Sequence, residues 1–276
     1  MKTVHVISFV LAGLLFGCGR KAIPKGDTLK VVAEKQSVIS ILSYNIHHAS
    51  PPSRPGVIDV NAIASVINQQ KVDIVALQEL DVNTTRSGVS LNEAEEIARL
   101  TGMTAFFAKS INYAGGQYGV AILSKLPMEN KNVTPLPTDD ATKGEHRTLA
   151  TATIVLPGNK KFVFACTHLD AQHEDVNRQL QIKKILEVLK QESLPVVIAG
   201  DFNALPNSDV IKQLDSYFTR SCVSNCPFTI PETSSNRTID YIAFAPATKF
   251  SVLSHTVVDE SYASDHRPVK AQLQIQ

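Results

Sequence analysis

The chain has 276 residues, a formal net charge of +1 at pH 7 and no tryptophan. This near-neutral charge argues against a protein that binds its partner through general attraction to a phosphate backbone. The sequence contains no long low-complexity run and no internal repeat, so its main part suits a single domain of ordinary size.

The first residues have the pattern of an export signal. An apolar run extends from Val4 to Phe16, and its core of about a dozen residues is too short to cross a membrane as a helix. The run ends in Leu-Phe-Gly-Cys, which resembles a bacterial lipobox with Cys18 as the lipidated residue. A plain signal peptide followed by a chance cysteine is the alternative.

These features predict an exported protein that a lipid on Cys18 anchors to a bacterial membrane, in the periplasm or at the cell surface. The expected divisions are a signal peptide over 1–17, a lipidated tether over 18–36 and one folded domain over 37–276.

The first elements of the domain are two strands and two helices. Residues 37–46 and 72–79 are rich in aliphatic and β-branched side chains and predict buried strands. Between them, Asp59 is suited to cap an amphipathic helix. A short acidic helix is expected over 91–100, with Gly102 ending it.

The middle of the chain predicts three strands separated by turns. A glycine-rich turn at 115–119 leads to a strand at 120–124, whereas 127–143 has three prolines and is expected to be a loop. Residues 146–155 alternate as a half-exposed strand, and a Pro-Gly-Asn turn joins them to a strand at 161–168.

The last part begins with a helix over 174–190, on which Val176 and Leu180 are assigned to the core face. A buried strand follows from Leu194 and ends in Gly-Asp-Phe-Asn at residues 200–203. The remaining predicted elements are a helix from the cap Ser208 to Leu214 and strands at 238–244, 250–258 and from 269 onward.

Strands and helices do not alternate steadily along this chain. We therefore expect an α+β fold of two mixed, largely antiparallel sheets packed face to face, with helices on the outside.

Three cysteines lie beyond Cys18. Cys166 falls within an apolar strand and is predicted to be a core residue. Cys222 and Cys226 flank three loop-like residues. A local disulfide is the better prediction for an exported protein, because no nearby histidine or further cysteine completes a zinc site.

Polar residues follow the predicted strands repeatedly. Asp201 and Asn203 are spaced i and i+2, which places both side chains on one side of an extended chain. Carboxylate and amide oxygens suit Mg²⁺ or Mn²⁺, and histidines among them can transfer protons near neutral pH. This combination is typical of hydrolysis at phosphorus. The set comprises Asn45, Glu79, His168, Asp170, Asp201, Asn203, Asp240, Asp265 and His266.

The order of these motifs resembles the endonuclease/exonuclease/phosphatase family, over about Ile39 to Gln274. Each motif is weak alone, but six in family order are specific. The resemblance implies a four-layer α/β/β/α sandwich and a catalytic domain over 37–276. The motifs are Tyr44-Asn45, Leu77-Gln78-Glu79, Thr167-His168-Leu169, Gly200-Asp201-Phe202-Asn203, Ile239-Asp240-Tyr241 and Ser264-Asp265-His266-Arg267-Pro268.

The resemblance also implies roles for single residues. Glu79 and Asp265, with Asn45 close by, would hold Mg²⁺ or Mn²⁺. Asp201 would orient or deprotonate the attacking water, and Asn203 would hold a phosphate oxygen.

The histidines complete the implied catalytic set. His266, paired with Asp240, would stabilise the charge on the phosphoryl group or act as the base. His168 would donate to a phosphate oxygen or protonate the leaving group, and Arg147 resembles a phosphate-contacting arginine of part of the family.

Other interpretations remain open for several of these residues. Asp240 could be a structural acid, Arg147 a surface charge and Asp170 a cap for the segment that follows it. Tyr118 is a candidate substrate contact, and Arg86 could contact a substrate phosphate or hold its loop. The histidines without motif support are expected in loops or facing solvent: His47, His48, His146, His173 and His255.

The predicted substrate is a small-molecule or lipid-linked phosphate ester, cleaved by in-line attack of water. Family members that cut DNA often carry a basic residue two positions after the metal-binding glutamate, where this chain has Asp81. An acid facing the backbone would repel a nucleic acid. The alternatives are a surface-anchored nuclease that cleaves DNA or RNA and a non-catalytic binding protein. We expect a monomer.

Overall fold

The structure is a computed structural model that describes residues 1, 3 and 37–276. The predicted lipid attachment at Cys18 and the tether over 18–36 lie outside the described residues, as does the signal peptide apart from residues 1 and 3. These segments therefore stay predictions. Among the described residues, no helix is long and apolar enough to cross a membrane.

The first sheet has its strands in the spatial order β11-β12-β1-β2-β4-β3. Strands β1 and β2 pair in parallel, and the other neighbours pair antiparallel. The strands are β1 (Ser37–Asn45), β2 (Ile74–Val82), β3 (Thr104–Tyr113), β4 (Gly116–Ser124), β11 (Phe250–Val257) and β12 (Val269–Ile275).

The second sheet repeats this plan in the order β5-β6-β7-β8-β10-β9. Here β7 and β8 are the parallel pair. The strands are β5 (Met128–Leu136), β6 (Arg147–Val155), β7 (Lys161–His168), β8 (Val196–Asp201), β9 (Thr219–Arg220) and β10 (Asp240–Ala245).

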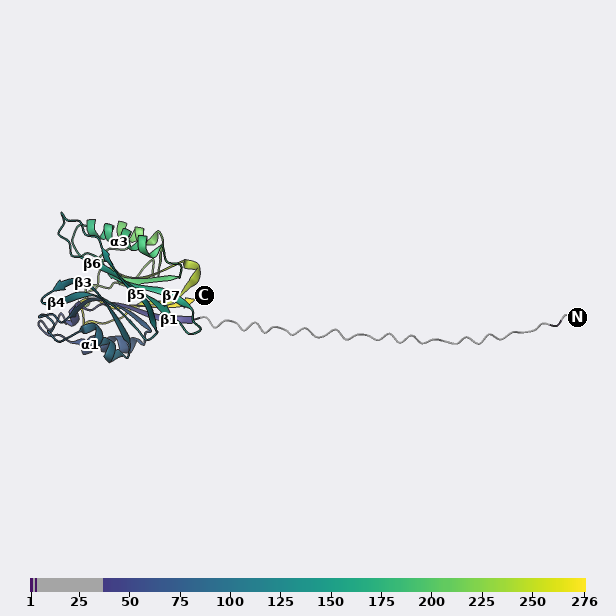
Figure 1. Cartoon of the computed structure of the whole chain (residues 1–276), viewed down its shortest axis with the longest axis horizontal. Coiled ribbons are helices and arrows are strands. Elements are labelled where there is room, and N and C mark those ends of the chain that lie inside the picture. Colours follow the sequence, from purple (N-terminus) through teal and green to yellow (C-terminus); the bar gives the residue numbers. More distant parts are fainter. Residues whose placement is uncertain (2, 4–36) are drawn as a thin grey trace. The chain divides into compact units, whose positions relative to one another are not determined.

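Helices cover the outer faces of the two sheets (Figure 1). Helices α1 (Val60–Gln70) and α2 (Glu93–Thr101) pack on the first sheet, and α3 (Val176–Leu189) and α4 (Asp209–Asp215) pack on the second. A third apolar cluster fills the space between the sheets. This is the predicted α/β/β/α sandwich. Two short 3₁₀ turns complete the description, η1 (His47–Ala49) and η2 (Ala247–Lys249).

The predicted helix caps are confirmed. Asp59 Oδ1 accepts from the Ala62 N–H at 3.0 Å, and Ser208 Oγ accepts from the Ile211 N–H at 3.3 Å. Gly102 ends α2 with φ +66°, a left-handed conformation that glycine adopts without steric cost.

Some predictions of local structure are wrong. The segment expected to be a loop contains β5, an exposed edge strand in which Pro135 is tolerated. Strand β6 is buried, not half-exposed, since its side chains join the apolar clusters on both faces of the sheet. Strand β3 was not predicted. On α3, Val176 and Leu180 are exposed.

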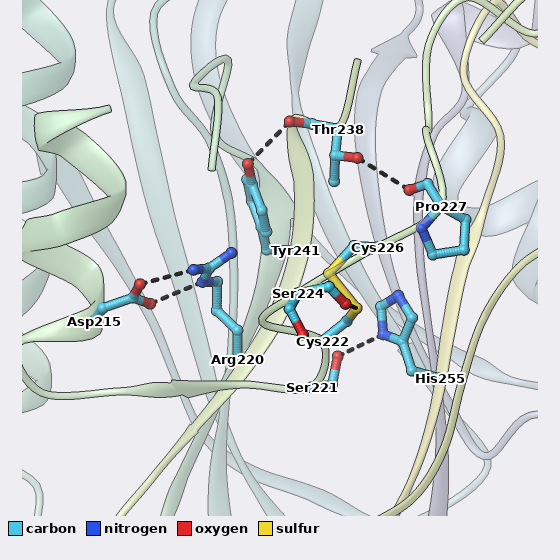
Figure 2. Close-up of a disulfide and its surroundings, with 10 residues drawn as sticks. All are labelled: Asp215, Arg220, Ser221, Cys222, Ser224, Cys226, Pro227, Thr238, Tyr241 and His255. Carbon is cyan, nitrogen blue, oxygen red and sulfur yellow. Dashed lines mark hydrogen bonds and ion pairs between the residues drawn. A yellow bond between two sulfur atoms is a disulfide. The ribbon is translucent and has the colours of Figure 1, made fainter. Parts of the chain in front are cut away.

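The predicted disulfide between Cys222 and Cys226 is present (Figure 2). Cys166 is a free buried cysteine. The disulfide closes a loop beside the start of β10, where Thr238 Oγ1 donates to the Pro227 carbonyl at 3.0 Å. This loop therefore packs next to the strand that carries Asp240.

Replacing both Cys222 and Cys226 by Ser should lower the free energy of unfolding by about 2 kcal/mol, because so short a loop restricts the unfolded chain only modestly. Urea unfolding under oxidising conditions measures the difference. A change below about 0.5 kcal/mol would show that the disulfide does not constrain the unfolded chain.

Candidate active site

Asp201 lies at the centre of a row of three polar residues on neighbouring strands. It ends β8, and its register partners are His168 on β7 and Asp240 on β10. All three side chains are buried. Gly200 permits the close approach of β7 and β8, because a Cβ there would lie 2.1 Å from the Thr167 carbonyl oxygen. The local sequence thus sets three chemically active groups side by side.

The charges in this row are balanced by His266. Its Nδ1 lies 3.0 Å from Asp240 Oδ2, and its Nε2 lies 3.7 Å from Asp201 Oδ2. Burial opposes protonation of His266, but the carboxylates of Asp240, Asp201 and Asp265 outweigh it and raise the pKa to about 10. The predicted pairing of His266 with Asp240 is confirmed.

The surroundings of Asp201 disfavour its charged form. Burial, followed by the charge of Asp240, raises the pKa of Asp201 to about 7, against the lowering effect of His266. Two donors hold the carboxylate in place: the Asn203 N–H at 2.8 Å from Oδ1 and Asn45 Nδ2 at 3.1 Å from Oδ2.

Asn45 joins the two sheets at the site. Its Nδ2 donates both to Asp201 Oδ2 and to Glu79 Oε1, the latter at 2.9 Å. Glu79 has φ +62° and lies where the pairing of β2 with β4 shifts between Leu77 and Leu80. A bulge of this kind re-aims a side chain, here towards Asn45.

Asp265 reaches the same region through Ser264. Ser264 Oγ donates to the Asn45 carbonyl at 2.7 Å and lies 3.3 Å from Asp265 Oδ1. The charge of Asp265 contributes to the raised pKa of His266. The structure therefore brings the three predicted metal ligands, Asn45, Glu79 and Asp265, to one end of the sandwich. A tighter cluster of possible ligand atoms, all within 4.8 Å, belongs to Asp201, Asp240 and His266.

His168 is a neutral hydrogen-bond donor. Arg147 Nη1 lies 3.0 Å from His168 Nδ1, and because a guanidinium can only donate, Nδ1 accepts and the proton resides on Nε2. That nitrogen lies 3.6 Å from Asp201 Oδ2, which can accept its proton. Asn203 Nδ2 lies 3.0 Å from it but is itself a donor, and bonds to the Leu169 carbonyl. Burial, Arg147 and His266 all lower the pKa of His168 well below its ordinary value.

Arg147 is buried, so its interpretation as a surface charge is wrong. Glu145 Oε1 forms an ion pair with its Nη1 at 2.9 Å, and Tyr118 lies within hydrogen-bonding reach of the guanidinium and near Glu79. Burial, chiefly, raises the pKa of Glu145. Glu145 carries no motif, and its position two residues before Arg147 was the only signal that could have found it.

Two buried polar residues, Asp170 and Asn177, hold the loop that carries Glu145. Asp170 Oδ2 accepts from the Glu145 N–H at 3.0 Å, and its Oδ1 accepts from the Gln172 N–H at 2.9 Å. Asn177, on α3, accepts from the Asp139 N–H at 2.8 Å. Asp170 therefore caps loop backbone, in keeping with the structural interpretation of this residue.

The interpretation of Asp81 as an acid facing a nucleic-acid backbone is wrong. Asp81 is fully buried and receives two bonds from Arg86, at 2.8 and 2.9 Å. Ser87 and Thr84 also donate to it. Burial alone would raise the pKa of Asp81, but these donors lower it overall. Arg86 therefore holds its loop, one of its two predicted roles.

A sequence model of the Endonuclease/Exonuclease/phosphatase family matches residues 42–266. The chain belongs to this family. Its members are hydrolases of phosphate esters, so the predicted family and reaction class are confirmed.

Similar proteins match nearly the full length of the folded domain. YbhP of Escherichia coli K12, an uncharacterized protein, is 24% identical over 255 residues, covering 87% of this chain and 98% of YbhP. A functionally unknown protein from Enterococcus faecalis V583 has a TM-score of 0.73 at 20% identity, covering 86% of this chain and 100% of its own. A mannosyl-6-phosphatase from Bacteroides thetaiotaomicron has a TM-score of 0.68 at 18% identity, covering 85% and 99%. These likenesses show the shared fold.

The buried carboxyl group of Glu93, next to Asp81, should make the stability of the fold depend on pH. Its Oε2 accepts from the Asp81 N–H at 2.8 Å, and burial, chiefly, raises its pKa from 4.5 to about 8. Because the pKa of Glu93 is higher in the folded than in the unfolded protein, the protonated carboxyl group favours the folded state. This stabilisation of the fold is complete below about pH 4.5 and is lost as the pH rises towards 8.

Glu93→Gln removes the ionisation, so its free energy of unfolding relative to the wild type should rise between pH 5 and pH 8. Each unit of pKa shift corresponds to about 1.4 kcal/mol, as an upper limit. Urea unfolding at both pH values measures the effect, with the exposed Glu95→Gln as the control. A difference that is constant with pH would contradict the raised pKa.

Proposed function

We propose that the protein is a Mg²⁺- or Mn²⁺-dependent phosphoric ester hydrolase that cleaves a small-molecule or lipid-linked phosphate by in-line attack of water. The observation that carries this proposal is the row of His168, Asp201 and Asp240, joined through Asn45 to Glu79.

The residues present fit a hard divalent cation. One amide nitrogen, on Asn45, contacts carboxylates of both Glu79 and Asp201. Within residues 37–276, neither Glu79 nor Asp265 forms an ion pair with a lysine or arginine. Glu79, Asp265 and Asn45 would hold the metal, which when bound supplies positive charge for phosphate oxygens and lowers the pKa of a coordinated water.

The chain's own residues supply orientation and proton handling. In this proposal Asp201 orients the attacking water and accepts its proton, and Asn203, which contacts both Asp201 and His168, holds a phosphate oxygen. His266, held by Asp240, faces Asp201 and can stabilise negative charge on the phosphoryl group. His168, as a neutral Nε2–H donor, suits a phosphate oxygen or the leaving oxygen.

A small substrate is favoured over a nucleic acid. The net charge of +1 supplies no general attraction for a phosphate backbone. The buried arginine of the site, Arg147, is paired with Glu145 and His168. The mannosyl-6-phosphatase that shares the fold acts on a compact phosphate ester, by its name. We further propose export, anchoring through Cys18 and a monomeric state.

The full chain, kept in detergent because of its proposed lipid, should release phosphate or a phosphorylated headgroup from sugar phosphates, inositol phosphates or sphingomyelin when Mg²⁺ is present. EDTA should stop the reaction. Plasmid nicking measured in parallel tests the alternative, and robust nicking without release from the small esters would replace our proposal by a nuclease.

Asp201→Asn keeps the side-chain shape but removes the charge that orients water, so kcat should fall by about 10³-fold or more. Asp209→Asn, on the exposed surface of α4, is the matched control and should retain full activity. Equal kcat values for the two variants would remove Asp201 from the mechanism.

A further inference from the structure

The turn directly after Asn45 has an unusual backbone. His47, His48 and Ala49 all have left-handed conformations, with φ of 47°, 41° and 52°. Such conformations are strained in residues other than glycine, and they concentrate at functional sites. The His47 N–H donates to Asn45 Oδ1 at 3.1 Å, so this turn is attached to the candidate active site.

The two histidines of the turn differ in their contacts. His47 Nδ1 lies 2.9 Å from the Ser50 carbonyl, so this ring nitrogen has a hydrogen-bond partner. His48 Nδ1 is buried, and no residue in 37–276 bonds to it. An orphaned buried N–H is costlier than an orphaned acceptor, so the proton of the neutral ring belongs on Nε2. The ring is partly exposed, and Nε2 is the nitrogen that a ligand can reach.

His48 lies close to charged residues at the edge of the candidate active site. The charges of Arg86, Asp81 and Asp265 all act on this ring. Burial, Arg86 and His47 lower the pKa of His48 to about 4, so it is neutral at physiological pH.

Arg86, whose charge acts on His48, has one guanidinium nitrogen that could bind a ligand. Its Nε and Nη2 donate to Asp81, which fixes the plane of the guanidinium. The guanidinium carbon lies 4.5 Å from the ring centre of Tyr113 and 5.8 Å from that of Tyr118. Nη1 has no partner among the described residues, and the side chain is 31% exposed. Tyr118 also lies near Arg147 and Glu79, so Arg86 lies on the Glu79 side of the site.

We propose that His48 and Arg86 form an anion subsite beside the catalytic residues, which binds a second phosphate or a carboxylate of the substrate. This inference rests on the proposed function and narrows its substrate class to phosphate esters that carry a second anionic group. The subsite offers Nη1 of a fixed guanidinium together with a neutral Nε2–H donor, and oxyanions bind to such charge-assisted donors. Asp81 acts as the group that orients the binding residue.

The test is the affinity of the full chain for fructose 1,6-bisphosphate relative to fructose 6-phosphate, measured by calorimetry with Mg²⁺. Asp201→Asn serves as the parent so that no turnover occurs. We expect the parent to bind the bisphosphate at least about tenfold tighter. A ratio near one would overturn the subsite whether or not the wild-type enzyme hydrolyses phosphate esters, whereas absence of hydrolysis with the ratio intact would overturn only the proposed function.

Two variants separate binding from a structural effect of the turn. His48→Asn removes the imidazole, and asparagine tolerates the left-handed conformation, so the ratio should fall towards one. His47→Asn is the matched control in the same turn and should keep the parent ratio. Arg86→Lys retains the charge but loses the planar set of N–H donors, and should also lower the ratio of the two affinities. Equal losses in the His47 and His48 variants would assign the turn a structural role and contradict the proposal.

Discussion

Two carboxylates that face each other across neighbouring strands place the strongest constraint on this protein. Asp201 and Asp240 are register partners on β8 and β10, and both are buried. Like charges in directly opposed positions destabilise a sheet. His266 contacts both carboxylates, and Asn45 donates to Asp201, so these side chains make the arrangement tolerable. Because such a pair costs stability, its presence supports the proposed functional role of the row.

The sandwich explains how distant segments reach this row. Each sheet contains one parallel pair, β1 with β2 and β7 with β8. The carboxyl ends of parallel strands lie at the same edge of a sheet, so β7 and β8 carry His168 and Asp201 to one edge. In the other sheet, β1 ends at Asn45 opposite Gln78 of β2, which sets Asn45 beside Glu79 at the bulge. The apolar cluster between the sheets holds these two edges together, and the Asn45 amide bridges them.

The sequence was most informative where a motif coincided with the end of a buried strand. The convergence of the polar side chains was predictable because apolar runs followed by acids, amides or histidines have few structural explanations. The disulfide was predictable from two cysteines close together in a loop-like segment. Edge strand β5 was not, because its side chains are exposed and its apolar pattern is weak. Asp81 was misread because its partner Arg86 satisfies it only in the fold. The left-handed turn at His47 and His48 has no glycine to reveal it in the sequence.

The proposed mechanism requires that Asn45, Glu79 and Asp265 bind one divalent cation. Calorimetric titration of the full chain with Mn²⁺ measures this without any substrate. We expect saturable binding that Glu79→Gln weakens at least about tenfold and that Asp209→Asn leaves unchanged. Absence of saturable binding, or wild-type affinity in the Glu79 variant, would contradict it.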